Sequence, residues 1–252
     1  MWSDFISMNC QGLVIGERIV GENGKFLDIL TDELGLIEVA QKGVKSIKNE
    51  NRASLQMFTY SNLCVEKSKK HYVVKSSELI ESFYGMREDL LGLALASYIS
   101  QVTTYTIGQH STDSVAILKL ILNIFYYISN HQRCISQLKS IFELRFISEM
   151  GFSPNLLVCG RCELSLTDSL YFSIRHNSMI CQNCASMEDL QISKAVFKSM
   201  QHIVFSDYSR LFNFKLSDAS LRQLGRLTES ILLSTLNRGF SSLDYFKSIA
   251  TM

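Results

Sequence analysis

The fold of the first part of the chain is decided by one stretch of sequence, Gly12-Leu-Val-Ile-Gly-Glu-Arg-Ile-Val-Gly-Glu-Asn-Gly-Lys-Phe-Leu-Asp-Ile-Leu-Thr31. Two runs rich in apolar and β-branched residues flank a glycine and asparagine cluster at 21–24, a pattern typical of two strands joined by a hairpin turn. Three similar runs follow. The sequence therefore predicts five strands, over residues 12–20, 25–31, 36–43, 57–66 and 71–75.

The segment between the third and fourth runs is long enough for a short helix, which is predicted over residues 46–55. Five short strands with one helical interruption favour a small barrel of the OB type. A five-stranded barrel of the SH3-like type would give much the same pattern, and strand pattern alone does not separate the two.

Beyond residue 80 the apolar residues recur every three or four positions, which indicates helices. Two such stripes are Leu90, Leu91, Ala94, Tyr98 and Val102, and Leu138, Ile141, Phe142 and Arg145. The apolar run 115–128 is interrupted by Lys119 and Asn123 and is too short to cross a bilayer, so a buried helix is predicted there.

Capping residues predict where several helices begin and end. The helix through Glu149 is expected to stop at Gly151, a natural left-handed cap, because Pro154 follows three residues later. Ser193 and Ser217 are expected to cap the first turns of two further helices.

The chain has seven cysteines, and four of them form two pairs, Cys159-Gly-Arg-Cys162 and Cys181-Gln-Asn-Cys184, with 18 residues between the pairs. This spacing is typical of a tetrahedral zinc site with four thiolate ligands. Four sulfur ligands leave no open position for water, so one structural zinc ion is predicted. The alternative is a redox role for either pair, which the presence of two matched pairs disfavours.

The segment between the two pairs is expected to form the small hairpin of a zinc ribbon, from residues 171–174 and 179–180. The three remaining cysteines, Cys10, Cys64 and Cys134, are expected to be buried small hydrophobic residues. This use of cysteine suits a reducing compartment. The first ten residues show no export-signal pattern, so a cytoplasmic location is expected.

The net charge is only +1, but the charge is unevenly distributed. Residues 1–40 carry two basic residues against seven acidic ones, whereas residues 41–75 carry eight basic residues against two acidic ones. Such a cluster can attract a polyanion to one surface. The alternative is a solvated sheet edge whose lysines prevent aggregation.

Three aromatic residues, Phe58, Tyr60 and Tyr72, lie close in sequence to the basic cluster. Cations for phosphates and flat rings for unpaired bases are the recurring features of single-strand binding sites. The alternative for each ring is a place in the barrel core.

The sequence contains no recognisable catalytic constellation. Gly24-Lys25 resembles the end of a phosphate-binding loop, but Phe26 stands where that loop needs Ser or Thr. The five histidines, His71, His110, His131, His176 and His202, match no metal or hydrolase spacing. Since the predicted metal site is closed, a zinc-dependent enzyme is also disfavoured. We expect a protein without enzymatic activity.

Three stretches, in this order and spacing, resemble the RecO family of bacterial recombination mediators. The first joins the opening stretch to Gly35-Leu-Ile-Glu-Val-Ala-Gln-Lys-Gly-Val-Lys45. The second is Phe142-Glu-Leu-Arg-Phe-Ile-Ser-Glu-Met-Gly-Phe-Ser-Pro-Asn-Leu156, which runs into the first cysteine pair. The third is Phe240-Ser-Ser-Leu-Asp-Tyr-Phe246, so the resemblance covers nearly the whole chain.

The resemblance implies an α+β chain with an N-terminal five-stranded OB-type barrel and a helical domain that contains the four-cysteine zinc module. The expected domains are 1–80 for the barrel, 81–156 and 191–252 for the helical domain, and 157–190 for the zinc module. The implied activity is binding of single- and double-stranded DNA and annealing of complementary strands. With RecR, such a protein helps load RecA onto single-stranded DNA covered by single-strand binding protein. Neither a membrane nor a small-molecule substrate is implied.

The resemblance also indicates, by position, which basic residues contact DNA. These are Lys42, Lys45 and Lys48 after the third strand, with Arg18 and Arg52. The full set of DNA-contacting candidates also includes Lys25, Lys69 and Lys70. Members of the family often carry a denser arginine-rich run after the third strand, which Gln41 and Val44 interrupt here. We therefore expect a modest DNA affinity or a dependence on RecR. The alternative function is a protein–protein adaptor in a repair complex, with little DNA binding of its own.

Overall fold

The computed structural model describes residues 7–20, 24–42, 53–68, 71–107, 114–166 and 169–251. Contacts within the chain define two compact units. The first combines residues 1–131 with 240–252, and the second comprises residues 132–239. The finer boundaries expected at residues 80, 156 and 190 stay a prediction.

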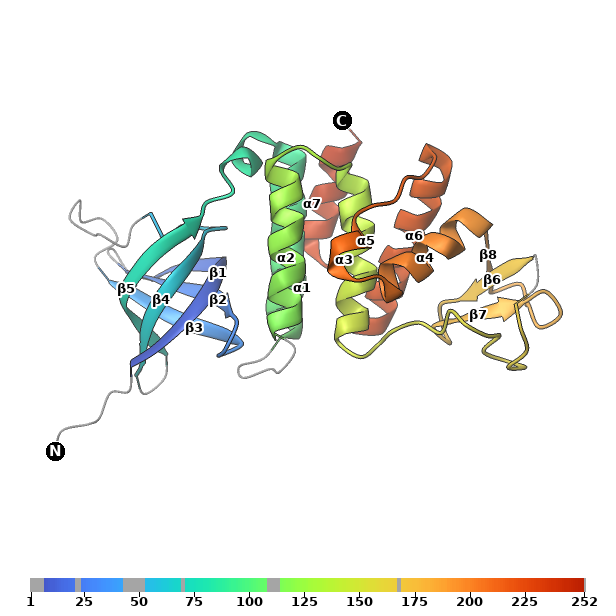
Figure 1. Cartoon of the computed structure of the whole chain (residues 1–252), viewed down its shortest axis with the longest axis horizontal. Helices are drawn as coiled ribbons and strands as arrows, with labels where there is room; N and C mark the ends of the chain where they lie inside the picture. The colour runs from blue at the N-terminus through green and yellow to red at the C-terminus, as the bar shows by residue number, and fades with distance from the viewer. Residues whose placement is uncertain are drawn as a thin grey trace. The chain divides into compact units, whose positions relative to one another are not determined.

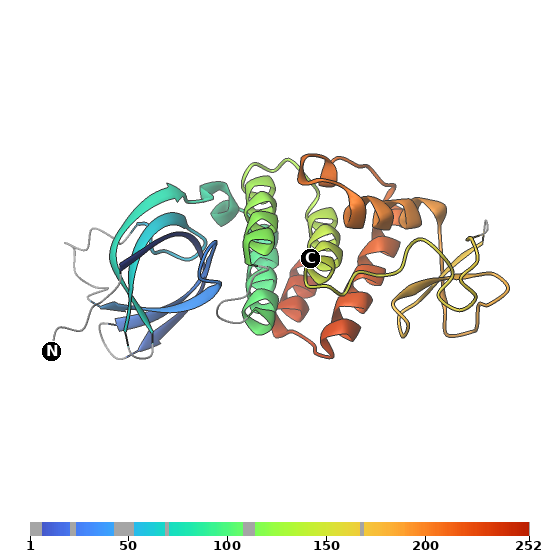
Figure 2. The ribbon, with the colours of Figure 1, turned by 60° about the horizontal axis from the view of Figure 1, so that its bottom comes forward.

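The described strands of the first unit close into a barrel, drawn in blue to teal in Figure 1. They are β1 (Ser7–Val20), β2 (Gly24–Thr31), β3 (Leu36–Lys42), β4 (Tyr60–Lys67) and β5 (Tyr72–Glu81). The strand order is β1-β2-β3-β5-β4, and β4 pairs back with β1. Only the pairing of β3 with β5 is parallel among these strands, and Figure 2 shows them curving around a shared interior. The prediction of five N-terminal strands is confirmed.

Two strands extend beyond their predicted limits. β1 begins at Ser7 and β5 continues to Glu81, because the polar residues in these extensions still pair with β4. Alternation of apolar residues detects only the part of a strand that has a buried face. The two extensions are largely exposed, so that pattern did not find them.

The fourth strand begins at Tyr60, later than predicted, because a turn precedes it. Phe58 has a left-handed backbone (φ 64°), and the Thr59 hydroxyl donates a hydrogen bond to the Gln56 carbonyl oxygen at 2.7 Å. The helix predicted over 46–55 lies mostly outside the described residues. Its described end, 53–55, is a turn, so the helix prediction was wrong for that end.

All five strands contribute apolar side chains to the barrel core. These are Cys10, Val14, Leu27, Ile29, Ile37, Val39, Leu63, Val65 and Tyr72, with Leu55 from the turn before β4. Leu13, Val14 and Ile15 are consecutive and all buried, which strict alternation does not allow. A β-bulge at Ile15 and the contact of β1 with helix α1 explain why both faces of the strand are covered.

Helices α1 (Leu90–Thr106), α2 (Ser114–Ser129) and α7 (Ser241–Ala250) complete the first unit, after the short 3-10 helix η1 (Tyr84–Glu88). The predicted stripe is confirmed for Ala94, Tyr98 and Val102, which are fully buried, whereas Leu90 in the first turn is exposed. The helix predicted over 115–128 is likewise confirmed, since α2 spans the whole stretch, and side chains such as Ile121 and Phe125 are buried. Among the described helices, none is both long and apolar enough to span a membrane.

Aromatic contacts attach the barrel to these helices. The ring of Phe125 in α2 makes edge-on contacts with Phe58 and Phe83, with ring centroids 5.4 and 5.7 Å apart. The C-terminal helix returns to this unit, where the Ser242 backbone N–H donates to the Gln101 side-chain oxygen at 3.1 Å. These rings and hydrogen bonds join segments far apart in sequence into one core.

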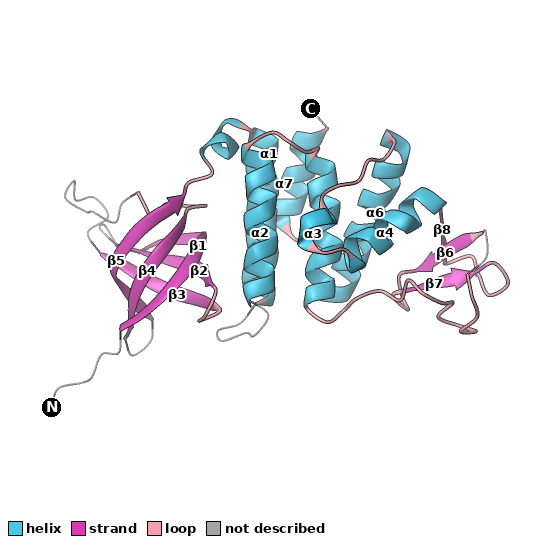
Figure 3. Ribbon diagram, in the orientation of Figure 1, coloured by secondary structure: helices cyan, strands magenta, loops and turns pink. Residues whose placement is uncertain are grey.

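The second unit contains helices α3 (Ile135–Glu149), α4 (Lys194–Phe205), α5 (Tyr208–Leu211) and α6 (Asp218–Leu236). The capping predictions are confirmed. Gly151 follows α3 with a φ of 86°, and the Ser193 and Ser217 side chains accept hydrogen bonds from the first turns of α4 and α6. The described strands of this unit belong to one small antiparallel sheet (Figure 3) of β6 (Leu170–Ser173), β7 (Ser178–Cys181) and β8 (Leu190–Ile192). The predicted hairpin is β6–β7, and β8 adds a third strand that was not predicted.

A buried ion cluster joins α3 to α6. The Lys139 ammonium lies 2.6 Å from the Glu143 carboxylate and 2.9 Å from that of Glu229. The Thr228 hydroxyl donates to the other Glu143 oxygen at 2.8 Å. Burial lowers the pKa of Lys139, but the two carboxylates outweigh this effect and raise the pKa above its ordinary value. Helix α3 is therefore held in register against α6 by charge as well as by apolar packing.

Candidate metal centre and nucleic-acid surface

The structure brings the four paired cysteines together. The sulfur atoms of Cys159, Cys162, Cys181 and Cys184 all lie within 4.8 Å of one another. Cys159 and Cys181 are buried, and Cys162 and Cys184 are half-buried. The four residues come from two loops that are far apart in sequence, as the spacing of the pairs predicts.

The first cysteine loop turns back on itself and is attached to β7. The Glu163 backbone N–H donates to the Cys159 carbonyl oxygen at 2.9 Å, and Glu163 has a left-handed φ of 60°. The Gly160 N–H donates to the Met179 carbonyl oxygen at 2.8 Å. A side chain at Gly160 would collide with the Ser178 side chain, so this close approach requires glycine.

The second cysteine loop begins at the end of β7. Cys181 is the last residue of that strand, and the Cys184 N–H closes a turn by donating to the Cys181 carbonyl oxygen at 3.0 Å. The Cys181 N–H in turn donates to the Cys159 sulfur at 3.4 Å. This bond joins the two loops directly at the sulfur cluster.

The electrostatic environment differs among the four thiols. Burial raises the pKa of Cys159, but backbone N–H donors from Cys181, Arg161 and Cys162 outweigh it and lower this pKa to about 6. The neighbouring Cys162 and Cys181 side chains raise the pKa of Cys184 to about 12. The fold thus favours the thiolate form of Cys159 and the protonated form of Cys184 before a metal ion binds.

The dimensions of the sulfur cluster suit a tetrahedral ion. Metal–sulfur bonds of about 2.3 Å place the sulfurs of a tetrahedral zinc site about 3.8 Å apart. The sulfurs of Cys162 and Cys181 are 3.7 Å apart. Four sulfur donors also suit a soft or borderline ion and not a hard oxygen-binding cation. The group can therefore hold a metal ion.

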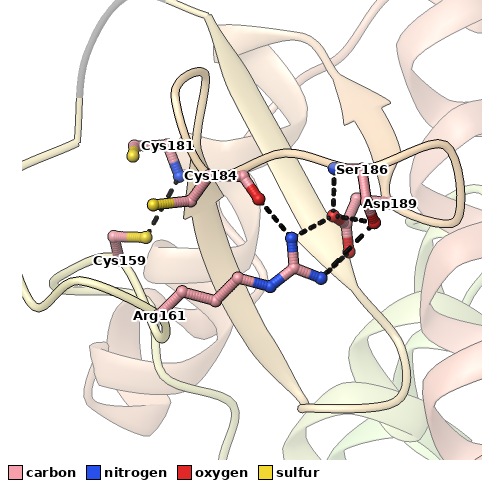
Figure 4. Close-up of polar contacts among 6 residues, drawn as sticks. All are labelled: Cys159, Arg161, Cys181, Cys184, Ser186 and Asp189. Carbon is pink, nitrogen blue, oxygen red and sulfur yellow. Dashed lines mark hydrogen bonds and ion pairs between the residues drawn. The ribbon is translucent and has the colours of Figure 1, made fainter.

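An arginine between the first two cysteines connects the two loops (Figure 4). The Arg161 guanidinium makes two contacts with the Asp189 carboxylate, at 2.9 and 3.3 Å, and donates a further hydrogen bond to the Cys184 carbonyl oxygen. Asp189 also accepts from the Ser186 backbone N–H at 2.7 Å. The pair was not predicted, because Asp189 is distant from Arg161 in sequence and belongs to no motif.

Most of the predicted DNA-contacting residues, Lys45, Lys48, Arg52, Lys69 and Lys70, lie outside the described residues. Lys42 ends β3, and its side chain lies outside the described part. Arg18 is described and its side chain is 66% exposed, although it pairs with Glu38 at 2.6 Å. Lys25 is only 13% exposed and donates to Glu17 at 3.1 Å, so its ammonium already has a partner.

The strand ends that flank the basic segments meet at one end of the barrel. Lys42 pairs with Gly24, and Lys67 pairs with Tyr72. Tyr72 also pairs with Val39, so the end of β3, the end of β4 and the start of β5 are neighbours. The chain therefore leaves β3 and β4 at the same end of the barrel.

A cluster of rings and cations lies at this end of the barrel. The ring of Phe26 is 5.3 Å from that of His71, in an edge-on arrangement, and 5.5 Å from the Arg18 guanidinium carbon. The Lys67 ammonium is 5.9 Å from the centroid of the Tyr72 ring. Phe26 and His71 were not predicted as site residues. Phe26 pairs with Arg18 across the β1–β2 ladder. The side-chain alternation of the predicted hairpin was therefore the one signal in the sequence that could have placed Phe26 beside Arg18.

The three aromatic residues predicted as base-stacking candidates are buried or half-buried. Phe58 and Tyr72 are buried in the core, as the alternative for these rings anticipated. Tyr60 is half-buried, and its hydroxyl donates to the Gln11 side-chain oxygen at 2.6 Å. Of the three, only Tyr72 contacts a described lysine, Lys67, through its ring.

A polar hollow on the barrel carries negative charge. Its volume is about 540 Å³, and its lining includes Asn9, Asp32, Glu33 and Glu78. Burial and the Asp32 carboxylate raise the pKa of Cys10, which also lines it, to about 12. Such a surface repels a polyanion, so DNA binding is not expected here.

The three unpaired cysteines differ in burial. Cys10 is buried, as predicted. Cys64 is half-buried, and Cys134 is exposed, so the prediction of burial was wrong for Cys134. Cys134 directly precedes α3, where a residue outside the helix has few neighbours to cover it.

Comparison with known proteins identifies relatives along the whole chain. The family model described as "Recombination protein O N terminal" matches residues 6–83, and the one described as "Recombination protein O C terminal" matches residues 87–244. The "DNA repair protein RecO" of Acetivibrio thermocellus is 31% identical over 244 residues, covering 96% of this chain and 97% of that protein. Proteins of the same name from Caldicellulosiruptor saccharolyticus and Clostridium kluyveri are 26% and 24% identical. They cover 96% and 99% of this chain and 98% and 97% of their own lengths.

These matches include both compact units and the four-cysteine segment. Family membership supports a role in DNA repair and recombination. The chain belongs to the RecO family.

Proposed function

We propose that this chain is a recombination mediator that binds single- and double-stranded DNA and anneals complementary strands without enzymatic activity. The observation that carries the proposal is the cluster of Arg18, Phe26, His71 and Lys67 at one end of the barrel. The strands there lead into segments 43–52 and 69–70, which carry further basic residues. Cations and half-buried rings with accessible edges together suit an unpaired DNA strand.

The barrel is proposed to be of the OB type. Its strand order β1-β2-β3-β5-β4 and its size support this assignment over the SH3-like alternative. OB barrels commonly bind oligonucleotides across one face and its flanking loops. The basic segments 43–52 and 69–70 follow β3 and β4 along the chain.

Annealing needs only charge neutralisation and proximity. Two strands repel one another through their phosphates, and bound cations reduce this repulsion until base pairing supplies the free energy. No nucleotide hydrolysis is required. The proposed contacts are Arg18, Lys42, Lys45, Lys48, Arg52, Lys69 and Lys70. Lys25 is not proposed as a direct phosphate contact, because its ammonium is paired with the Glu17 carboxylate.

The four cysteines are proposed to hold one structural zinc ion. When bound, the ion would supply a covalent-like link between the two cysteine loops, with all four coordination positions occupied by sulfur. This chain's own residues provide the sulfur ligands and the N–H donors that hold the loops together.

We also propose that the protein acts with partners. Together with RecR, the protein would act in the cytoplasm at the nucleoid, helping to load RecA onto DNA covered by single-strand binding protein.

The alternative is a protein adaptor that binds little DNA. The low net charge and the acidic hollow with Asp32, Glu33 and Glu78 favour this alternative. An adaptor would bind its partner proteins through surfaces other than the basic segments 43–52 and 69–70. Removing those basic residues would then leave partner binding unchanged and have no other effect.

Equilibrium binding to labelled single strands and duplexes tests the proposal. The wild type is compared with the variant Lys42→Ala/Lys45→Ala/Lys48→Ala and with a control, Lys119→Ala/Lys198→Ala/Lys215→Ala, which loses the same charge elsewhere. We expect the first variant to lose affinity and its salt dependence to decrease, by about 0.7 log units per single-strand contact removed, while the control stays close to wild type. Equal behaviour of both variants, with RecR present and absent, would favour the adaptor.

A further inference from the structure

We propose that Arg161 and Asp189 form a clamp that positions the four cysteines before a metal ion binds and slows release of the ion afterwards. The inference rests on the proposed metal site and goes beyond the ligand set. It assigns a role to two residues that do not contact the metal. Both are therefore positioning residues.

The clamp joins the two cysteine loops through side chains alone. Arg161 lies between Cys159 and Cys162, and Asp189 lies beyond Cys184. The two contacts between guanidinium and carboxylate, 2.9 and 3.3 Å long, have the forked geometry that fixes orientation as well as distance. The metal-free loops are therefore held in register by contacts that do not involve sulfur.

The Asp189 side chain is only 1% exposed, so its carboxylate depends on protein groups and not on water for its partners. A buried carboxylate needs charge and hydrogen bonds to compensate for lost water. The Ser186 backbone N–H and hydroxyl donate to it at 2.7 and 2.8 Å, and Arg161 supplies the positive charge. The contacts with Ser186 and Arg161 thus hold the segment that follows Cys184.

The clamp also places positive charge beside the sulfur cluster. Four thiolates around a divalent cation carry a net charge of −2, which a nearby guanidinium stabilises. The Arg161 guanidinium also donates to the Cys184 carbonyl oxygen, so the charge lies directly beside one ligand residue. Outer contacts of this kind orient metal ligands and influence affinity.

Release of zinc from the full chain into an excess of the chromogenic chelator 4-(2-pyridylazo)resorcinol measures the effect. The variants are Arg161→Ala, Asp189→Asn and the pair combined, each loaded with zinc. We expect metal retention to weaken by about 10- to 100-fold in either single variant. The double variant should be little worse than the single ones, because the two residues act as a unit.

Two variants serve as charge-matched controls. Arg175→Ala and Glu188→Gln each remove one charge from exposed positions of the same module, and both should retain zinc as the wild type does. Arg161→Lys keeps the charge but not the fork, so intermediate retention would separate charge from geometry. Zinc release at the wild-type rate from both Arg161→Ala and Asp189→Asn overturns the clamp.

A spectroscopic measurement separates positioning from general loss of structure. Cobalt(II) bound in place of zinc gives a ligand-field spectrum that reports tetrahedral geometry. We expect altered band intensities in Asp189→Asn while the helical circular dichroism is unchanged. An unaltered cobalt spectrum with wild-type affinity contradicts the proposal. A wild-type protein that binds neither ion overturns the metal site itself, and DNA binding is measured independently of both.

Discussion

The guanidinium carbon of Arg18 lies 5.5 Å from the centroid of the Phe26 ring, across the ladder in which these two residues pair. Side chains of directly paired residues share one face of a sheet. His71 contacts the same ring from the start of β5. The three side chains thus gather a cation and two rings on one surface of the barrel, near the end of β3 and the start of β5.

Replacing Phe26 by leucine should weaken binding of single strands more than of duplexes. Stacking of a base on an aromatic ring contributes about 1–3 kcal/mol, so the single-strand affinity should fall about 5- to 150-fold. Paired bases are not available for stacking, and duplex affinity should change less. The measurement is fluorescence anisotropy with both DNA forms, with Phe152→Leu as an exposed aromatic control in the second unit. Equal losses for both forms would exclude stacking on Phe26.

Removing the partner of Arg18 should have the opposite effect to removing Arg18. Glu38 holds the Arg18 guanidinium at 2.6 Å and therefore competes with phosphate. We expect Arg18→Ala to lower DNA affinity at low salt and Glu38→Gln to raise it, each by up to about fivefold, because exposed ion pairs contribute at most about 1 kcal/mol. Changes of the same sign in both variants would contradict this account of the pair.

Cys162→Ser should destabilise the metal module. Apparent free energies of structural zinc binding are about 10–16 kcal/mol, so loss of one ligand removes much of what holds residues 157–190 together. Hydrogen exchange should become fast in this segment and stay slow in α3. Cys134→Ser is the control, because Cys134 is exposed and lies away from the sulfur cluster in sequence. Full thermal stability of Cys162→Ser, with no zinc in either protein, would refute the site.

Lys139→Met should destabilise the second unit, because it leaves the fully buried Glu143 carboxylate without its cation. Breaking one side of a buried pair costs about 3–5 kcal/mol. The double variant Lys139→Met/Glu143→Met removes both charges and should recover part of this loss. Urea denaturation followed by circular dichroism measures both. A double variant less stable than Lys139→Met would show that the charge itself is not the cause.

Much of the second unit was predictable because its determinants are local. Gly151, Ser193 and Ser217 act within one turn of their helices, and each was predicted to cap. The cysteine pairs were equally predictable, because their spacing alone implies a shared ion. Glu149 pairs with the neighbouring Arg145 at 2.6 Å, at helical spacing.

Contacts between distant segments were not predictable from sequence. The partners of Glu143 and Arg161 lie on other elements and follow no motif. Lys25 was predicted to contact DNA because it is basic, but its position on β2 places its ammonium beside the Glu17 carboxylate. In the sequence, Phe26 drew notice only because it stands where a phosphate-binding loop needs Ser or Thr. Its proximity to His71 depends on the neighbouring ends of β2, β3 and β5, which only the barrel topology brings together.

The most direct test of the central claim is the rate at which two labelled complementary oligonucleotides anneal without nucleotide, measured across a salt series. The wild type is compared with Lys42→Ala/Lys45→Ala/Lys48→Ala and with the matched triple variant at Lys119, Lys198 and Lys215. The account predicts acceleration that fades steeply with salt, weakens in the first variant and persists in the control. No acceleration at any salt, alone or with RecR, would contradict it and favour the adaptor.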